Sequence, residues 1–162
     1  TAKAFSFYGD YPIGTLGLSV VLFLVGKRLR RVSFQRLAIG CVLAASIAGL
    51  GVNMVRSTAG RPRPMAAMED GFYGPSLKYE LHGFPSAHAT TSMATAAVFI
   101  IPAPAVGVPM VILAAGVSWS RMHLWRHHPT DVTVGSFVGL MVGLGFGAVI
   151  RRRNRLGLEL GS

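Results

Sequence analysis

Residues 120–155 read SRMHLWRHHPTDVTVGSFVGLMVGLGFGAVIRRRNR, and this stretch carries the features that decide the fold. A polar segment rich in arginine and histidine comes first, and an uncharged apolar run over residues 132–150 follows it. The run is close to the roughly 20 residues that cross a bilayer as a helix. The arginines at 151–153 and 155 are typical of the cytoplasmic end of such a helix. We therefore expect a membrane-spanning helix here.

Four more apolar runs precede this one, at residues 9–26, 34–55, 87–101 and 105–119. The charged fraction of 14% lies well below the roughly 25% of soluble domains. Because apolar runs recur along the whole chain, the sequence predicts an all-α polytopic transmembrane bundle with five spans in a single domain, residues 1–162. Glycines at 135, 139, 143 and 147 recur every fourth residue, which predicts a closely packed helix face.

Charge outside the runs predicts the orientation. One basic cluster, between the first two runs, comprises Lys27, Arg28, Arg30, Arg31 and Arg36, and the second follows the last run. Five spans place both clusters on one side, which the positive-inside rule makes cytoplasmic. The C-terminus is then cytoplasmic, and the loops at 56–86 and 120–131 face the other side. We expect a bacterial inner (plasma) membrane protein with these loops on the periplasmic or extracytoplasmic face.

The chain has 16 Lys and Arg against 6 Asp and Glu, a net charge of +10. Such a balance suits nucleic acid, anionic lipid or phosphorylated ligands. No basic stripe on a soluble helix and no interleaved aromatic residues accompany it, so no nucleic-acid partner is expected. Cys41 is the one cysteine and lies in an apolar run, which excludes an intrachain disulfide and a cysteine metal cluster.

Three polar segments lie at the outer ends of the runs: RSTAGRPRP (56–64), FPSAH (84–88) and SRMHLWRHHPTD (120–131). They gather cations where the positive-inside rule predicts few. Guanidinium groups match phosphate oxygens in a bidentate way and stay charged, so we expect a phosphate ligand. Ser86 is expected to cap the third helix, whose first amides, at Ala87 and His88, form an anion site. The arginines concerned are Arg56, Arg61, Arg63, Arg121 and Arg126.

His127 and Asp131 have the spacing of a nucleophile and the group that orients it. A helix that starts near Pro129 puts the carboxylate about one turn beyond the imidazole, within reach of one ring nitrogen. The other ring nitrogen could then attack phosphorus. His88 comes from another helix and could protonate the leaving group.

These segments together resemble the type 2 phosphatidic acid phosphatase superfamily, which also includes vanadium haloperoxidases and glucose-6-phosphatase. The family pattern is Lys, six residues, Arg-Pro; then Pro-Ser-Gly-His; then Ser-Arg, five residues, His, three residues, Asp. The resemblance implies a metal-independent phosphatase without a cofactor. It also implies the roles in this chain: a nucleophile (His127), its partner (Asp131), a general acid (His88), and phosphate ligands (Arg56, Arg63, Ser86, Ala87 and Arg121).

This sequence departs from the family pattern at two positions. Arg56 replaces the family's Lys and keeps its charge, and Ala87 replaces Gly, which fits if an ordinary helix starts there. A register that ends at Arg61 would put Met54 at the Lys position, so Arg63 is the better match and Arg61 an auxiliary cation. Family members commonly have six spans, so a short or missing N-terminal helix is consistent with five.

The expected substrate is a lipid phosphate or pyrophosphate in the bilayer, of the phosphatidate, phosphatidylglycerophosphate, undecaprenyl pyrophosphate or lipid A type. Two alternatives stay open: a non-enzymatic protein that binds anionic lipid, and a metal-dependent hydrolase that uses His123, His127, His128 and Asp131. The sequence does not predict the oligomeric state.

Overall fold

The computed structural model describes residues 2–8 and 11–159, and every regular element within them is helical. The all-α prediction is therefore confirmed for this part of the chain. The elements are α1 (Ala2–Tyr8), the π-helical η1 (Tyr11–Gly17), α2 (Leu18–Arg28), α3 (Val32–Ala59), the short 3-10 turns η2 (Pro64–Ala66) and η3 (Tyr79–Leu81), α4 (Ala87–Ile100), α5 (Pro104–His123) and α6 (Pro129–Glu159).

Within the described residues, three helical segments are long and apolar enough to cross a membrane: Val32–Ala66, which contains α3, Pro104–His123 and Pro129–Gly157. The other two predicted runs coincide with shorter helices. The run at 87–101 is α4, whose 14 residues extend for about 21 Å, less than the roughly 30 Å of a bilayer core. The run at 9–26 corresponds to η1 and α2, and its first two residues lie outside the described part. The helices thus lie where the apolar runs were predicted. The predicted number of five spans is not confirmed, because only three of the described segments are long and apolar enough to cross a bilayer.

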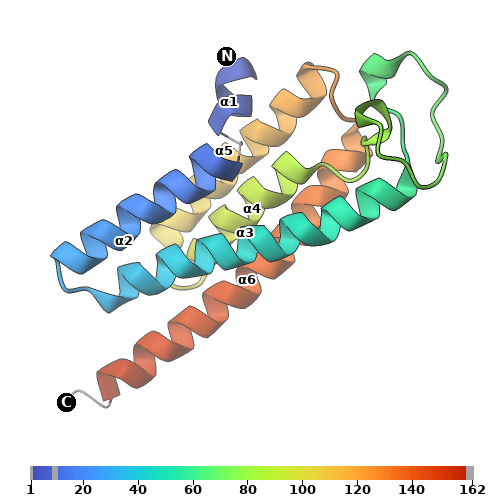
Figure 1. Ribbon diagram of the computed structural model, residues 1–162. Coiled ribbons are helices and arrows are strands. Elements are labelled where there is room, and N and C mark those ends of the chain that lie inside the picture. Colours follow the sequence, from blue (N-terminus) through green and yellow to red (C-terminus); the bar gives the residue numbers. More distant parts are fainter. Residues whose placement is uncertain (1, 9–10, 160–162) are drawn as a thin grey trace.

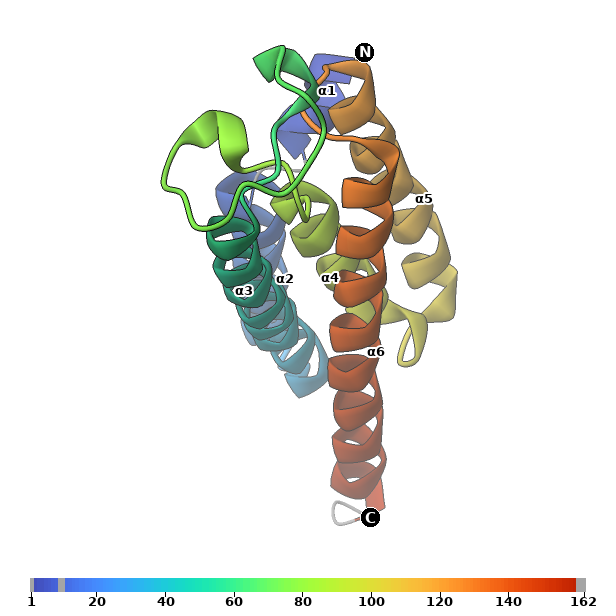
Figure 2. The ribbon, with the colours of Figure 1, turned by 90° about the vertical axis from the view of Figure 1, so that its right-hand side faces the viewer.

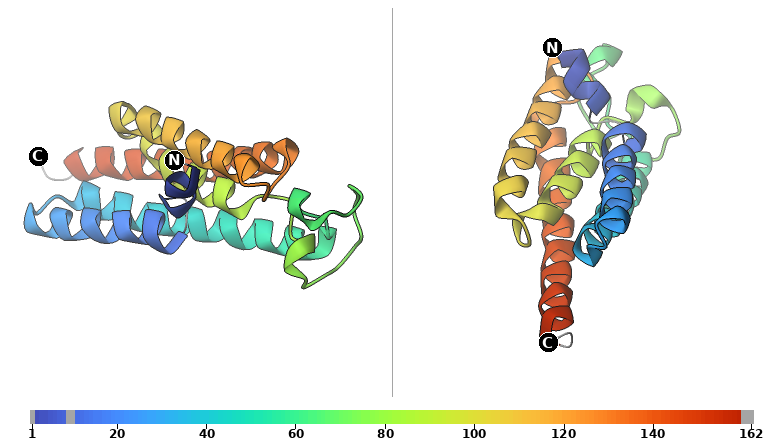
Figure 3. Two further views of the ribbon diagram at one scale, coloured as in Figure 1. Left: turned by 90° about the horizontal axis from the view of Figure 1, so that it is seen from above. Right: turned by 90° about the vertical axis from the view of Figure 1, so that its left-hand side faces the viewer.

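The short helix α4 lies at the centre of the bundle, between α3 on one side and α5 and α6 on the other (Figures 2 and 3). Most of its residues are buried, and many are Ala, Thr or Ser. The hydroxyl groups of Thr90 and Thr95 donate to backbone carbonyls one turn earlier in the helix, which satisfies them without water. Its last two turns pack with α3 in one apolar cluster that includes Cys41, Ala44, Ala94, Val98 and Phe99.

The predicted glycine face packs α6 against α4. A Cβ added at any of the four glycines would lie under 3.0 Å from a backbone carbonyl oxygen of α4 or of the residue that precedes it; in turn, these oxygens belong to Ser86, Thr90, Ala94 and Val98. Since backbone atoms cannot move aside as a side chain can, only glycine permits this approach. The close-packing prediction is confirmed, and the contact fixes the start of α6 beside the start of α4.

The polar loops and the basic clusters lie at opposite ends of the bundle (Figure 1). Arg36 at the start of α3 donates from Nη1 to the carbonyl oxygen of Arg153 (3.0 Å) and to Oδ1 of Asn154 (2.9 Å) near the end of α6. The two basic clusters are therefore neighbours, as a shared side of the membrane requires. The loop after α3 and the turn before α6 come together at the other end.

Candidate active site

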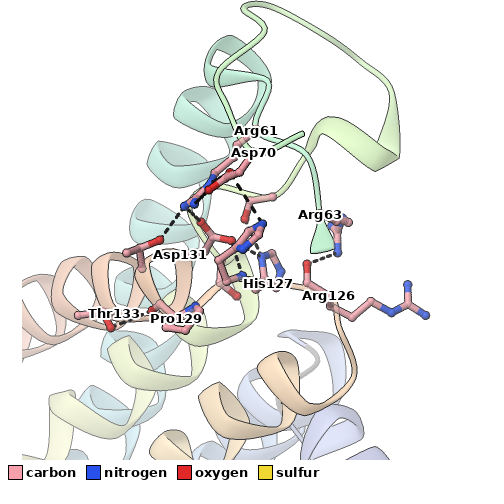
Figure 4. Close-up of polar contacts among 12 residues, drawn as sticks. Arg61, Arg63, Asp70, Arg126, His127, Pro129, Asp131 and Thr133 are labelled. Atoms are coloured by element: carbon pink, nitrogen blue, oxygen red, sulfur yellow. Dashed lines mark hydrogen bonds and ion pairs between the residues drawn. The ribbon is translucent and has the colours of Figure 1, made fainter. Parts of the chain in front are cut away.

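Three chain segments meet where α3 ends and α4 and α6 begin (Figure 4). Backbone hydrogen bonds join them: Gly83 N–H donates to the Arg61 carbonyl (2.8 Å), and Ser86 N–H to the Asp131 carbonyl (3.0 Å). Gly83 is required at this contact because a Cβ there would lie 2.8 Å from the carbonyl oxygens of both Arg61 and Pro62. The three polar segments quoted from the sequence are thus brought together.

His127 is buried in the turn before α6, with 2% of its surface exposed. Its Nδ1 lies 2.6 Å from the Gly83 carbonyl oxygen; a carbonyl can only accept, so Nδ1 carries the hydrogen. Nε2 has no hydrogen-bond partner among the described residues. Burial lowers the pKa of His127, and the charges of Arg63 and Arg121 lower it further, while the nearby Asp131 carboxylate opposes the shift. The imidazole is therefore neutral at neutral pH, with a free lone pair on Nε2.

Asp131 is fully buried and lies one turn beyond His127, as the spacing predicts, but its carboxylate is 3.8 Å from Nδ1. That separation is too long for a hydrogen bond. Oδ2 instead accepts the backbone N–H of His128 (2.7 Å), and Oδ1 accepts Nη1 of Arg61 (2.6 Å). Because α6 begins at Pro129, as predicted, Asp131 at the third helical position caps the helix start. The atom that holds the imidazole is the Gly83 carbonyl oxygen.

Arg63 is 4% exposed and is held by Tyr79. Its Nε donates to the Tyr79 carbonyl oxygen (3.0 Å), and its guanidinium lies 4.0 Å from the centre of the Tyr79 ring. Arg126 donates from Nη1 to the Tyr79 hydroxyl (2.5 Å). Arg56 and Arg121 lie close enough to Arg63 for their positive charges to act on its guanidinium group. Tyr79 belongs to none of the three polar segments quoted from the sequence, so no sequence pattern pointed to it.

The buried polar atoms at the site that lack a hydrogen-bond partner in the described part of the chain include Oγ of Ser86 and Nε of Arg56. Ser86 takes the cap position of α4, as expected, but its side chain makes no capping hydrogen bond, so that part of the prediction is wrong. Arg56 lies in the last turn of α3. Native proteins rarely leave buried polar groups unpaired, so such atoms mark a place for a ligand or water.

The remaining predicted residues lie at helix ends around these atoms. Ala87 is the first residue of α4 and does not have a positive φ, so alanine fits where the family has glycine. His88 follows it in the first turn of α4 and is half-buried. Arg121 is buried in the last turn of α5.

Arg61 is paired with carboxylates. Besides its bond to Asp131, it donates from Nε and Nη2 to the two oxygens of Asp70 (2.9 and 2.7 Å), and from Nη1 to Oγ1 of Thr130 (2.6 Å). It thereby ties the loop after α3 to the first turn of α6 (Figure 4). Its predicted role as an auxiliary cation for phosphate remains a prediction.

A pocket of about 440 Å³ opens beside His127 and Arg63. The other lining residues are Pro62, Pro64, Met68, Asp70, Met122, Trp125, His128 and Pro129. Within the described residues, no group of three His, Cys, Asp or Glu side chains is arranged to hold a metal ion. Of the alternative metal ligands, His123 stacks on Trp119, with 5.0 Å between the ring centres.

Comparison with known proteins identifies the family. A profile of the PAP2 superfamily matches residues 36–155. The chain belongs to this superfamily. The PAP2 chain is 34% identical over 145 residues to a decaprenylphosphoryl-5-phosphoribose phosphatase of Mycobacterium tuberculosis, covering 88% of this chain and 75% of the relative. It is 29% identical over 136 residues to a lipid A 1-phosphatase of Rhizobium etli, covering 75% and 59%.

A solved structure supports the same fold. The crystal structure of Aquifex aeolicus LpxE matches with a TM-score of 0.65 at 19% identity, over 90% of this chain and 82% of that chain. The family predicted from the three segments is therefore confirmed. Because the chain belongs to the PAP2 superfamily and its named relatives are phosphatases, the chain is a phosphatase.

Proposed function

We propose that this PAP2 chain is an integral membrane phosphatase that removes the terminal phosphate of a lipid through a phosphohistidine intermediate. The observation that carries the proposal is the state of His127, which is buried and neutral: Nδ1 is fixed by the Gly83 carbonyl, and Nε2 has no hydrogen-bond partner in the described part of the chain. A fixed imidazole with one free lone pair is suited to nucleophilic attack.

The phosphate group would lie between the ends of α3, α4 and α5. Ser86 Oγ and Arg56 Nε could donate to its oxygens, which would satisfy both buried atoms. The positive charges of Arg63 and Arg121 would stabilise the charge that develops on the oxygens, and the first amides of α4, at Ala87 and His88, would add donors. Arginines at fixed positions do this without reorganising during the reaction.

In the first step the Nε2 lone pair of His127 forms a bond to phosphorus, and the bond from phosphorus to the ester oxygen breaks. His88 would donate its proton to that oxygen, so the lipid alcohol leaves neutral. In the second step the oxygen of water bonds to phosphorus as the bond from phosphorus to Nε2 of His127 breaks, His88 takes the water's proton, and inorganic phosphate is released. In each step the attacking atom and the leaving atom lie on opposite sides of phosphorus, and the same arginines surround the phosphate oxygens.

We also propose the membrane arrangement predicted from charge: one domain with five spans, α2 and α4 being the short ones, in a bacterial plasma membrane. The adjacent basic clusters at Arg36 and Arg153 support a common cytoplasmic side that includes the C-terminus. The site at the opposite end would then face the periplasm or cell exterior. It would meet substrates whose phosphate lies at the bilayer surface.

The candidate substrates are phosphatidate, phosphatidylglycerophosphate, undecaprenyl pyrophosphate, lipid A phosphates and, from the name of a relative, decaprenylphosphoryl-5-phosphoribose. The test is phosphate release from each lipid by detergent-purified protein. We expect turnover that vanadate inhibits and EDTA does not, and none above background from a correctly folded His127→Ala variant. Parent-rate turnover by that variant would refute the nucleophile, and inhibition by EDTA would favour a metal hydrolase. A protein that binds these lipids without turnover would be the non-enzymatic alternative.

A further inference from the structure

The pocket beside His127 is the space for whatever group carries the phosphate. Its volume of about 440 Å³ lies in the range of about 300–1,000 Å³ typical of small-molecule sites. A phosphate that reacts at His127 and contacts Arg63 places the rest of the substrate next to the pocket, because both residues line it. The chemistry of the other walls therefore selects the adjoining group.

One wall offers an anionic hydrogen-bond acceptor. Asp70 lines the pocket, and Arg61 pairs with both Asp70 and the buried Asp131. Its hydrogen bonds hold the pKa of Asp70 below the usual range, and the Asp70 side chain is 55% exposed. Each carboxylate oxygen has two lone pairs and Arg61 takes one hydrogen bond at each, so Asp70 can still accept from a ligand. An acceptor of this kind suits hydroxyl groups and offers a second phosphate no hydrogen-bond donor.

A second wall is an exposed indole. Trp125 is 68% exposed and has a φ of 54°, in the left-handed region that bulky residues rarely adopt. Hydrogen bonds on both sides of the residue hold this conformation: its N–H donates to the Met122 carbonyl (2.9 Å), and its carbonyl accepts the Met65 N–H (3.2 Å). Strained backbone of this kind persists where the surrounding structure enforces it, often at ligand sites. Met68 and Met122 extend the apolar surface.

We infer that this pocket binds a neutral, hydroxyl-bearing ring, such as a sugar, that carries the phosphate to be removed. The indole would pack on the C–H face of the ring, and Asp70 would accept its hydroxyl groups. The chain would then act on lipid-linked sugar phosphates in preference to lipid pyrophosphates, whose second phosphate would meet Asp70. This inference rests on the proposed function and assigns its substrate class.

The test compares three probes with detergent-purified protein: decaprenylphosphoryl-5-phosphoribose, phosphatidate and undecaprenyl pyrophosphate. We expect the highest kcat/KM on the first. Trp125→Ala should raise KM for that probe about tenfold and change kcat and the phosphatidate KM little, while Trp125→Phe keeps an aromatic face and most of the affinity. Asp70→Asn should raise the rate on the pyrophosphate relative to the sugar phosphate. The matched control is Glu69→Gln, an exposed carboxylate on the same loop that does not line the pocket.

Each outcome bears on one proposal. Equal kcat/KM on the three probes, or a Trp125→Ala variant with the parent's KM for the sugar phosphate, would overturn the sugar subsite and leave the phosphatase intact. So would an Asp70→Asn variant whose selectivity matches that of Glu69→Gln. Absence of turnover on every probe by folded protein would instead overturn the proposed lipid substrates, and with them the subsite that rests on them.

Discussion

Replacing Gly83 by alanine tests whether its carbonyl orients the nucleophile. The new Cβ would lie 2.8 Å from the carbonyl oxygens of Arg61 and Pro62, and all of these atoms belong to backbone. The chain at residue 83 must therefore move by several tenths of an ångström, and its carbonyl, 2.6 Å from His127 Nδ1, must move with it. Overpacking of this kind costs about 1–3 kcal/mol of stability.

The catalytic effect of Gly83→Ala should exceed its effect on binding. Misplacing a reacting group by about 1 Å can cost roughly 100-fold in rate, so a smaller shift is expected to lower kcat by about tenfold or more with little change in KM. Gly71→Ala is the matched control, because a Cβ there meets nothing closer than 3.7 Å. The assay is steady-state phosphate release, with thermal stability measured in the same detergent. If Gly83→Ala keeps a kcat within about twofold of Gly71→Ala, the carbonyl does not orient His127.

Three further predictions follow from the same geometry. The acid limb of kcat/KM should lie below pH 6.5, since the pKa of His127 is lowered from that value. Arg63→Gln removes a positive charge that lowers this pKa, so it should move the limb to higher pH. A limb above pH 6.5 in the parent would contradict this. Tyr79→Leu should lower kcat/KM by roughly tenfold through loss of the ring under Arg63, and Tyr79→Phe should retain most activity; equal effects of the two would exclude the ring contact. Gly139→Ala should lower the thermal midpoint in a detergent-stability assay, because its Cβ meets α4 backbone, while Gly145→Ala, with open space around it, should not.

The helices could be predicted from the sequence because lipid-facing segments must be apolar over most of their length. The run at 34–55 falls inside α3, and the run at 132–150 inside α6. Their ends were underestimated, since α6 starts at Pro129 and continues past the arginines to Glu159. Hydropathy could not show that the run at 87–101 becomes a short central helix, because a buried helix and a lipid-facing helix are both apolar. The N-terminal helix α1 is too short to give a periodic signal.

The candidate site could be predicted as a set of residues, because the three segments have fixed internal spacings and lie at helix ends. Its hydrogen bonds could not. Gly83 and Tyr79 contribute backbone carbonyls, and a carbonyl acceptor has no signature in residue type. The stacking of Tyr79 under Arg63 depends on how the loop between α3 and α4 folds back, which no local pattern specifies.

The position of Arg61 explains why Asp131 does not bond the imidazole directly. An isolated buried carboxylate one turn from His127 would attract a proton to the ring and favour the charged imidazolium, which cannot attack phosphorus. Arg61 and the His128 amide instead take one carboxylate oxygen each, and the neutral Gly83 carbonyl holds Nδ1. This division of partners keeps His127 positioned and unprotonated. Asp131 at the start of α6 and Arg61 in the loop after α3 are therefore parts of one arrangement that joins these two segments of the site.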